Sequence, residues 1–109
     1  YPGLPGDKNH ALAEKYLGGH GCGVVTIIIR GGKANAVKFM DALQLACNEV
    51  HVADIRTCVL HPASETHRQL TDEQLLAAGI HPGMIRFSAG LESIDDILAD
   101  IEQALAKVE

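Results

Sequence analysis

The run Val24–Ile29 constrains the fold more than any other part of this chain. All six of its residues are β-branched, which predicts a strand. The side chains at 24, 26 and 28 share one face and those at 25, 27 and 29 share the other, and both faces are largely apolar. A sheet face that meets water should be polar. Either the second face meets something outside this chain, or helices cover both faces.

A second predicted strand, Met84–Ser88, alternates more regularly. Ile85 and Phe87 share one face, and Arg86 lies on the other. If Ile85 and Phe87 pack against helices, Arg86 lies on the uncovered side of the sheet.

Weaker signals delimit the other elements. Glycines, capping residues and apolar periodicity predict helices over 9–17, 33–47, 71–79 and 93–108, with Asn9, Thr71 and Ser93 as N-caps. A strand is expected over 57–60, and a strand or turn over 49–53. The connections around His51–Pro62 are too short for a parallel crossover. We therefore expect an α+β fold in two layers, a small and mostly antiparallel sheet with helices on one face.

Composition excludes several classes of protein. The 109 residues suit one domain, and the net charge of -5 argues against a nucleic-acid binder. The longest apolar run is too short to cross a membrane. Three widely spaced cysteines favour free thiols and a reducing, cytoplasmic setting. The first residue is Tyr1, which indicates either a removed leader or a piece of a longer chain.

Most catalytic motifs do not fit. The glycine-rich segment 19–23 precedes a strand, whereas a dinucleotide-binding fingerprint follows one. The histidines and cysteines lack metal-ligand spacing, so no metal site is expected. No serine stands in a nucleophile elbow, and no local signature selects one cysteine for a Cys–His pair.

Two features remain as candidates for binding. The segment 61–67, His-Pro-Ala-Ser-Glu-Thr-His, is a polar loop at a strand end, where binding residues often lie. It could equally be a hydrogen-bonded connector. Arg86 stands inside an apolar strand and must find an anion or water, and its fork suits a carboxylate. The alternative is a salt bridge to Asp54 or a nearby Glu.

These features occur together in an order that resembles a known family. The order runs from Tyr-Pro-Gly-Leu-Pro at the start through His-Pro-Ala-Ser-x-Thr-His at 61–67 to Ile-Arg-x-Ser-x-Gly-x-Glu at 85–92. It resembles the C-terminal domain of the pyridoxal-phosphate (PLP) enzymes of cysteine and methionine metabolism. The nearest pattern is that of the O-acetylhomoserine sulfhydrylases, or aminocarboxypropyltransferases.

The resemblance implies that residues 1–109 form the single small C-terminal domain of a PLP fold-type I enzyme. Its partner would be the protein's own large PLP-binding domain, absent from this chain, in a homotetramer that acts on a small amino acid. In the family the lysine that forms the Schiff base stands in a Ser-x-Thr-Lys context, which no lysine here has. The resemblance thus implies no catalytic residue in this chain, and PLP bound in the full-length enzyme but not to this domain.

It also implies roles for four residues in substrate binding. Arg86 would pair with the substrate α-carboxylate. His51 stands where relatives have Ser or Asn, in a turn near the same carboxylate, and Ala53 replaces a Gly. Thr66 and Ser64 would line the pocket entrance. The reaction implied is γ-replacement, in which acetate leaves from Cγ and sulfide or methanethiol adds to give homocysteine or methionine.

Other functions stay open. The domain could belong to a cystathionine γ-synthase, a cystathionine γ-lyase or a methionine γ-lyase, which resemble one another here. It could also be a self-standing, non-catalytic binding domain. Such a domain should carry polar residues on one face of the strand at 24–29, so the doubly apolar strand favours part of an enzyme, inactive alone.

Overall fold

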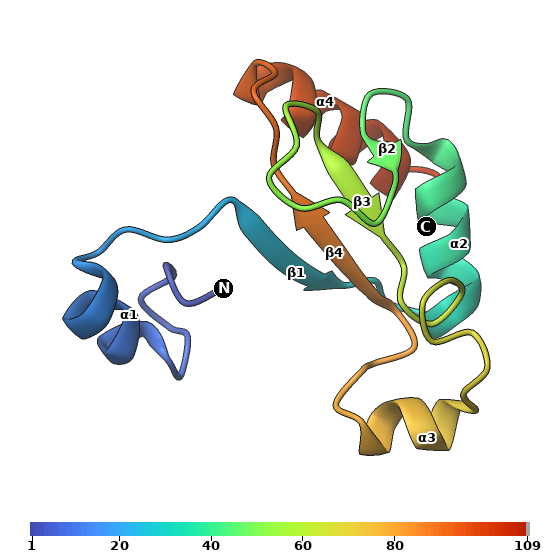
Figure 1. Cartoon of the computed structure of the whole chain (residues 1–109). Helices are drawn as coiled ribbons and strands as arrows, with labels where there is room; N and C mark the ends of the chain where they lie inside the picture. Colours follow the sequence, from blue (N-terminus) through green and yellow to red (C-terminus); the bar gives the residue numbers. More distant parts are fainter. Residues whose placement is uncertain (109) are drawn as a thin grey trace.

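The computed structural model describes residues 1–108 and has a four-stranded mixed sheet at its centre (Figure 1). The strand order is β1-β4-β3-β2, with bounds β1 Val24–Ile28, β2 Cys47–Asn48, β3 Cys58–Leu60 and β4 Met84–Ser88. The pairs β1·β4 and β4·β3 are antiparallel, and β2·β3 is parallel. The predicted α+β class and mostly antiparallel sheet are confirmed.

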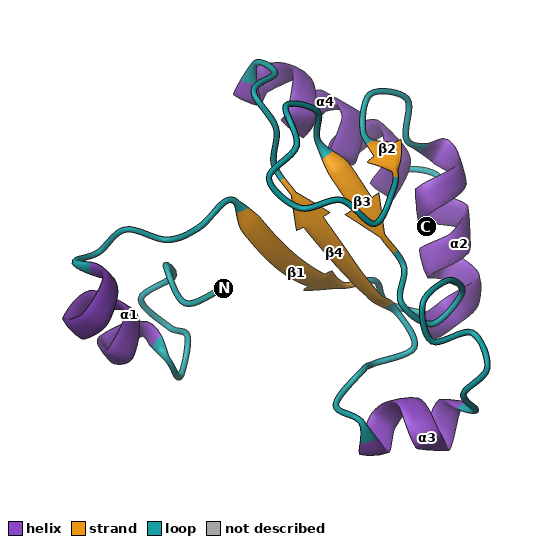
Figure 2. Ribbon diagram, in the orientation of Figure 1, coloured by secondary structure: helices purple, strands orange, loops and turns teal. Residues whose placement is uncertain are grey.

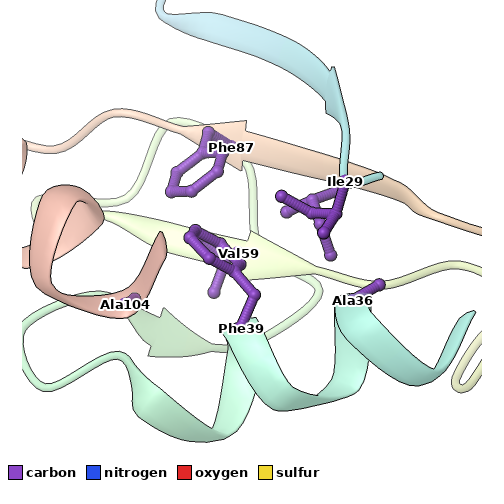
Figure 3. Packing of buried hydrophobic residues seen from close by; sticks show 7 residues of the cluster. Ile29, Ala36, Phe39, Val59, Phe87 and Ala104 are labelled. Atoms are coloured by element: carbon purple, nitrogen blue, oxygen red, sulfur yellow. The ribbon is translucent and has the colours of Figure 1, made fainter. Parts of the chain in front are cut away.

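Two helices cover one face of this sheet. They are α2 (Gly32–Ala42) and α4 (Ile94–Leu105). Phe39 of α2 and Ala104 of α4 are fully buried in one cluster with Val59, Ile85 and Phe87 of the sheet (Figure 3). The rings of Phe39 and Phe87 meet edge to face, with centroids 6.1 Å apart. This cluster is the core of the molecule.

The strand register determines which side chains face the helices and which lie on the opposite face of the sheet. Because Val25 pairs with Phe87 and Ile27 with Ile85, these four side chains point toward the helices. The opposite face holds Val24, Thr26 and Ile28 of β1 and Met84, Arg86 and Ser88 of β4, and it is called the open face below. Ile28 is 55% exposed there. The explanation with helices on both faces of β1 is therefore wrong.

The other two helices lie away from the sheet (Figure 2). They are α1 (His10–Leu17) and α3 (Asp72–Ala77). The capping box of α3 is confirmed, since Thr71 Oγ1 accepts from Gln74 N and Gln74 Oε1 accepts from Thr71 N. Asn9 and Ser93 stand at the predicted N-cap positions, but their side chains make no capping bond. No helix within residues 1–108 is long and apolar enough to cross a membrane.

The segment after α2 differs from the prediction. The helix expected over 33–47 ends at Ala42, because the next residue is extended and three N–H groups beyond it donate to the carboxylate of Asp100. Residues 49–53, where a strand or turn was expected, form no strand, and the strand lies just before them at Cys47–Asn48.

The pairing of β2 with β3 is also a correction. The connection between them was expected to be too short for a parallel return, yet the two strands are parallel. The return is possible because β2 has only two residues and lies at the sheet edge. Residues 49–57, called the 49–57 loop, carry the chain back without a helix.

Candidate functional site

Arg86 lies in the middle of β4 on the open face, between Thr26 of β1 and Leu60 of β3. Its Nη2 donates to the backbone oxygens of Val50, at 2.7 Å, and His51, at 3.2 Å. The predicted alternative, a salt bridge to Asp54 or a Glu, is wrong: within residues 1–108 no carboxylate oxygen lies within 4.0 Å of this guanidinium.

The guanidinium is only partly satisfied by these two carbonyls. Its Nε is buried and has no hydrogen-bond partner among the described residues. A buried donor without an acceptor costs about 1–3 kcal/mol. The Nη1 group also makes no hydrogen bond within residues 1–108, but unlike Nε it is not buried. A carboxylate that approached Nη1 would form a charge-assisted bond there. The geometry therefore suits an anion at Nη1.

The 49–57 loop supplies the two carbonyls, and a strand residue holds the loop in place. Ser88, at the end of β4, is buried, and its Oγ accepts a hydrogen bond from Ala53 N at 2.9 Å. Ala53 has a φ of 58°, in the left-handed region that glycine adopts most readily. Leu91 N also donates to Ile55 O at 2.8 Å.

The far end of the loop is fixed by a polar cluster around the buried Thr57. Glu92 accepts from Thr57 through both carboxylate oxygens, from the backbone N–H at 2.7 Å and the hydroxyl at 2.9 Å. The Thr57 hydroxyl in turn accepts from Gly90 N. The Thr57 backbone N–H holds the pKa of Glu92 below its ordinary value. The carboxylate is therefore ionised and ties the loop to the segment after β4.

The side chain of His51 does not contact Arg86. Its Nδ1 lies 3.0 Å from Glu49 Oε2 and 3.3 Å from Asp54 Oδ2. Arg56 binds the same Glu49 through both carboxylate oxygens, at 2.9 Å each. The backbone N–H of Arg56 lowers the pKa of Asp54. His51 thus contributes its carbonyl to Arg86, and its ring belongs to a surface charge network.

Thr66 and Ser64 lie in the segment that follows β3. Thr66 is exposed and its hydroxyl lies 2.9 Å from His67 Nδ1. Ser64 lines a shallow hollow with His61 and Glu65. In the described part of the chain, neither hydroxyl hydrogen-bonds to Arg86 or to the 49–57 loop. The structure brings Arg86 and the backbone of His51 together, but Thr66 and Ser64 do not contact either of these residues through a hydrogen bond.

Sequence reasoning missed Ser88 and gave no role to Glu92. Both stand in the motif at 85–92, and both are polar side chains at the carboxyl end of an apolar strand. Their position after an apolar strand was the only sign in the sequence that they could belong to the site. Ala53 was noted as a departure from the family, and its positive φ gives that departure a physical meaning.

Within residues 1–108, no lysine hydrogen-bonds to Arg86 or to the 49–57 loop. The Nζ of Lys33 donates to Ala63 O, and the other lysines, Lys8, Lys15, Lys38 and Lys107, are exposed. Ligand atoms of Glu49, Asp54 and Cys58 lie within 4.8 Å of one another. Arg56 lies 2.9 Å from Glu49 and 3.7 Å from Asp54, so both carboxylates also take part in an ion-pair network.

Comparison with known proteins gives a consistent result. Residues 1–106 match the model of one family, described as "Cys/Met metabolism PLP-dependent enzyme". The O-acetyl-L-homoserine sulfhydrylase of Leptospira meyeri is 46% identical over 99% of the chain and 25% of its own length. The L-methionine gamma-lyase of Pseudomonas putida is 41% identical over 96% and 26%.

Solved structures agree with this result. A Campylobacter jejuni protein described as a putative O-acetylhomoserine (thiol)-lyase, crystallised with a pyridoxyl-lysine, has a TM-score of 0.87 at 36% identity. The match covers 97% of this chain and 25% of that one. Cystathionine gamma synthase of Xanthomonas oryzae has a TM-score of 0.86 at 34% identity, covering 99% and 28%. The chain spans about a quarter of the length of these relatives.

Proposed function

The chain belongs to the Cys/Met metabolism PLP-dependent enzymes, and we propose that it binds the substrate α-carboxylate in an O-acetylhomoserine sulfhydrylase. It would act as the C-terminal domain of that enzyme and be inactive alone. Arg86 is the residue that carries this role. Holding the carboxylate orients the amino acid, so that its Cα–H bond is placed for proton removal.

One observation supports the proposal above the others: the half-satisfied guanidinium of Arg86. Its Nη2 is fixed by two backbone oxygens, while its Nε is buried without a partner among the described residues. The arginine is thus held in place before any ligand arrives. Pre-ordering of this kind lowers the entropy cost of binding.

The residues of this chain fit the substrate and not the covalent attachment of PLP. Lys33 donates to Ala63 O, and within residues 1–108 no lysine hydrogen-bonds to Arg86, which supports a Schiff-base lysine in the large domain. PLP, held by the protein's large domain, would supply an electron sink for the carbanion formed at Cα. His51 would hold Arg86 through its carbonyl, and Thr66 and Ser64 would line the entrance.

The sulfhydrylase reaction is favoured because sulfhydrylases of two bacteria share 46% and 42% identity with the chain. It would replace the acetate at Cγ by sulfide or methanethiol. A γ-lyase is the second candidate, since methionine gamma-lyases are 41% and 38% identical. The two differ in product: a lyase releases ammonia and an oxo acid, and a sulfhydrylase does not. We further propose a homotetramer working in the cytoplasm.

Arg86→Ala in the full-length enzyme should raise KM for O-acetylhomoserine about ten- to a hundredfold, because one charge-assisted carboxylate anchor is worth about 1.5–3 kcal/mol. Arg86→Lys should recover only part of this loss, since an ammonium cannot form two parallel bonds. The matched control is Arg30→Ala, which removes an exposed arginine. The measurement is steady-state kinetics, with PLP content followed by absorbance.

A second substrate makes this test specific. The amide of O-acetylhomoserine lacks the carboxylate, so Arg86→Ala should barely change its KM. An equal loss for acid and amide, or an unchanged KM for the acid, would remove Arg86 from the carboxylate role.

A further inference from the structure

Two thiols stand side by side at the edge of the sheet. Cys47 of β2 and Cys58 of β3 are register partners in the parallel pair, so their side chains share one face. Neighbouring strands lie about 4.8 Å apart. That spacing falls inside the range of about 4.4–6.8 Å between Cα atoms in disulfides. Both cysteines are free in this structure.

The two sulfurs differ in their surroundings. Cys47 is half-buried, and its Sγ accepts from Arg56 Nη1 at 3.7 Å. Cys58 is 1% exposed and its thiol donates to Arg56 O at 3.5 Å. Burial raises the pKa of the Cys58 thiol, which keeps it protonated. Cys47 is the more exposed of the two thiols, so an oxidant from solvent reaches it first.

We propose that Cys47 and Cys58 form a reversible disulfide across β2 and β3 when the protein meets a hydroperoxide. In the first step the Cys47 sulfur attacks the peroxide, the O–O bond breaks, and Cys47 becomes a sulfenic acid. The peroxide leaves as the corresponding alcohol, which is water when the oxidant is hydrogen peroxide. In the second step, the Cys58 sulfur displaces the sulfenic hydroxyl, which leaves as water. Two thiols are oxidised, and one peroxide is reduced.

The linkage would close a ring around the 49–57 loop. That loop carries the two carbonyls that hold Arg86, so the ring restrains the backbone of the candidate site. Arg56, which contacts both sulfurs, lies on the same loop. The proposal rests on strand register and does not depend on the substrate proposed above.

Peptide mapping tests the disulfide directly. The purified, reduced protein of native length is treated with hydrogen peroxide, its free thiols are blocked with N-ethylmaleimide, and it is digested with trypsin without reductant. Cleavage after Lys38, Arg56 and Arg68 separates the two cysteines into peptides 39–56 and 57–68, and Cys22 falls in peptide 16–30. The expected product is peptide 39–56 linked to 57–68, and dithiothreitol should separate them.

Variants distinguish the order of the steps. Cys22→Ser, at an exposed position in the N-terminal segment, is the matched control and should give the same linked pair. Cys58→Ser should stop the reaction at a Cys47 sulfenic acid, which dimedone traps. Blocked but unlinked peptides 39–56 and 57–68 in the wild-type protein, or a link from Cys47 to Cys22 or to a second molecule, would overturn the proposal.

Discussion

Backbone atoms hold the side chain of Arg86 in place. Arg86 is held by two carbonyl oxygens, and those carbonyls are aimed by a loop whose own anchor is the Ala53–Ser88 hydrogen bond. Ala53 makes that bond with a φ of 58°, where an L-residue other than glycine is disfavoured by about 1–2 kcal/mol. The loop is therefore built around one strained residue.

Ala53→Gly should stabilise the protein by about 0.5–1 kcal/mol, because removing the Cβ relieves strain that outweighs the added freedom of the unfolded chain. The measurement is the free energy of unfolding from a urea titration. Ala78→Gly, at an exposed residue with a φ of -82°, is the matched control and should be destabilising. A loss of stability at Ala53 as large as at Ala78 would contradict the strained conformation.

Sequence reasoning identified Arg86 because a lone charge inside an apolar strand is visible from alternation alone. It also placed His51 near Arg86, but through the family pattern and without knowing which atom is used. A backbone carbonyl leaves no mark in the sequence, and neither does the direction in which a side chain turns. Ser88 was missed because its hydroxyl bonds to a residue 35 positions away.

Helix α4 is joined to the segment between α2 and β2 by one buried carboxylate. Asp100 of α4 is 6% exposed and accepts from the N–H groups of Gln44, Leu45 and Ala46 at 2.8–2.9 Å. Gln103 adds a fourth donor at 3.0 Å. Burial raises the pKa of Asp100, but these donors outweigh it, so the pKa lies below the ordinary value. This acid ends α2 early and leads the chain into β2.

The stability of the protein should fall in acid through Asp100. A carboxyl with a depressed pKa in the folded state contributes stability fully above its unfolded pKa of about 3.9, and loses that contribution as pH falls through the folded value. Asp100→Asn should therefore be less stable than the wild type at pH 6, by about 1–3 kcal/mol. The difference should shrink steadily below pH 4.

Urea titrations at several pH values measure this difference. Asp96→Asn, on the exposed side of the same helix, is the control and should follow the wild-type curve. If the stability gap between the wild type and the Asp100→Asn variant stays constant from pH 6 to pH 2.5, the charge of Asp100 is not what stabilises the turn.

Local patterns predicted the longer elements well. Alternation predicted Met84–Ser88 with the bounds that the structure has, and the capping box predicted the start of α3. The early end of α2 could not be foreseen, because nothing in residues 33–47 is incompatible with a helix. It depends on Asp100, more than fifty residues later. The two-residue β2 carries too few residues to show a period.

The molecule as a whole consists of a packed sheet-and-helix body and an N-terminal segment that stands apart (Figure 1). None of the residues of α1 is buried. The segment is held mainly by its own contacts: Tyr1 hydroxyl to Cys22 O at 3.2 Å, and the Tyr1 amino group to Asp7 at 3.0 Å. Leu12 is 53% exposed to solvent and Tyr16 is 71% exposed.

Removal of residues 1–20 should leave the body folded. The segment adds no residue to the core cluster, so we expect the unfolding temperature to change by less than about 4 °C. Differential scanning calorimetry gives this value. Removal of residues 94–108 is the control, and should abolish cooperative unfolding because α4 supplies Ala104 and Ile101 to the core. A comparably large loss on removing residues 1–20 would mean that the segment and the body unfold as one unit.

The way in which Arg86 is held has an evolutionary consequence. Every residue type offers a carbonyl oxygen, so mutations at positions 50 and 51 can accumulate without depriving the arginine of its acceptors. We expect selection to act instead on Ser88 and on position 53, because their hydrogen bond fixes the loop that carries the carbonyls. An alignment of homologues should show a variable residue at position 51 and a nearly constant one at position 88. Conserved positions alone would therefore not reveal which atoms contact the guanidinium.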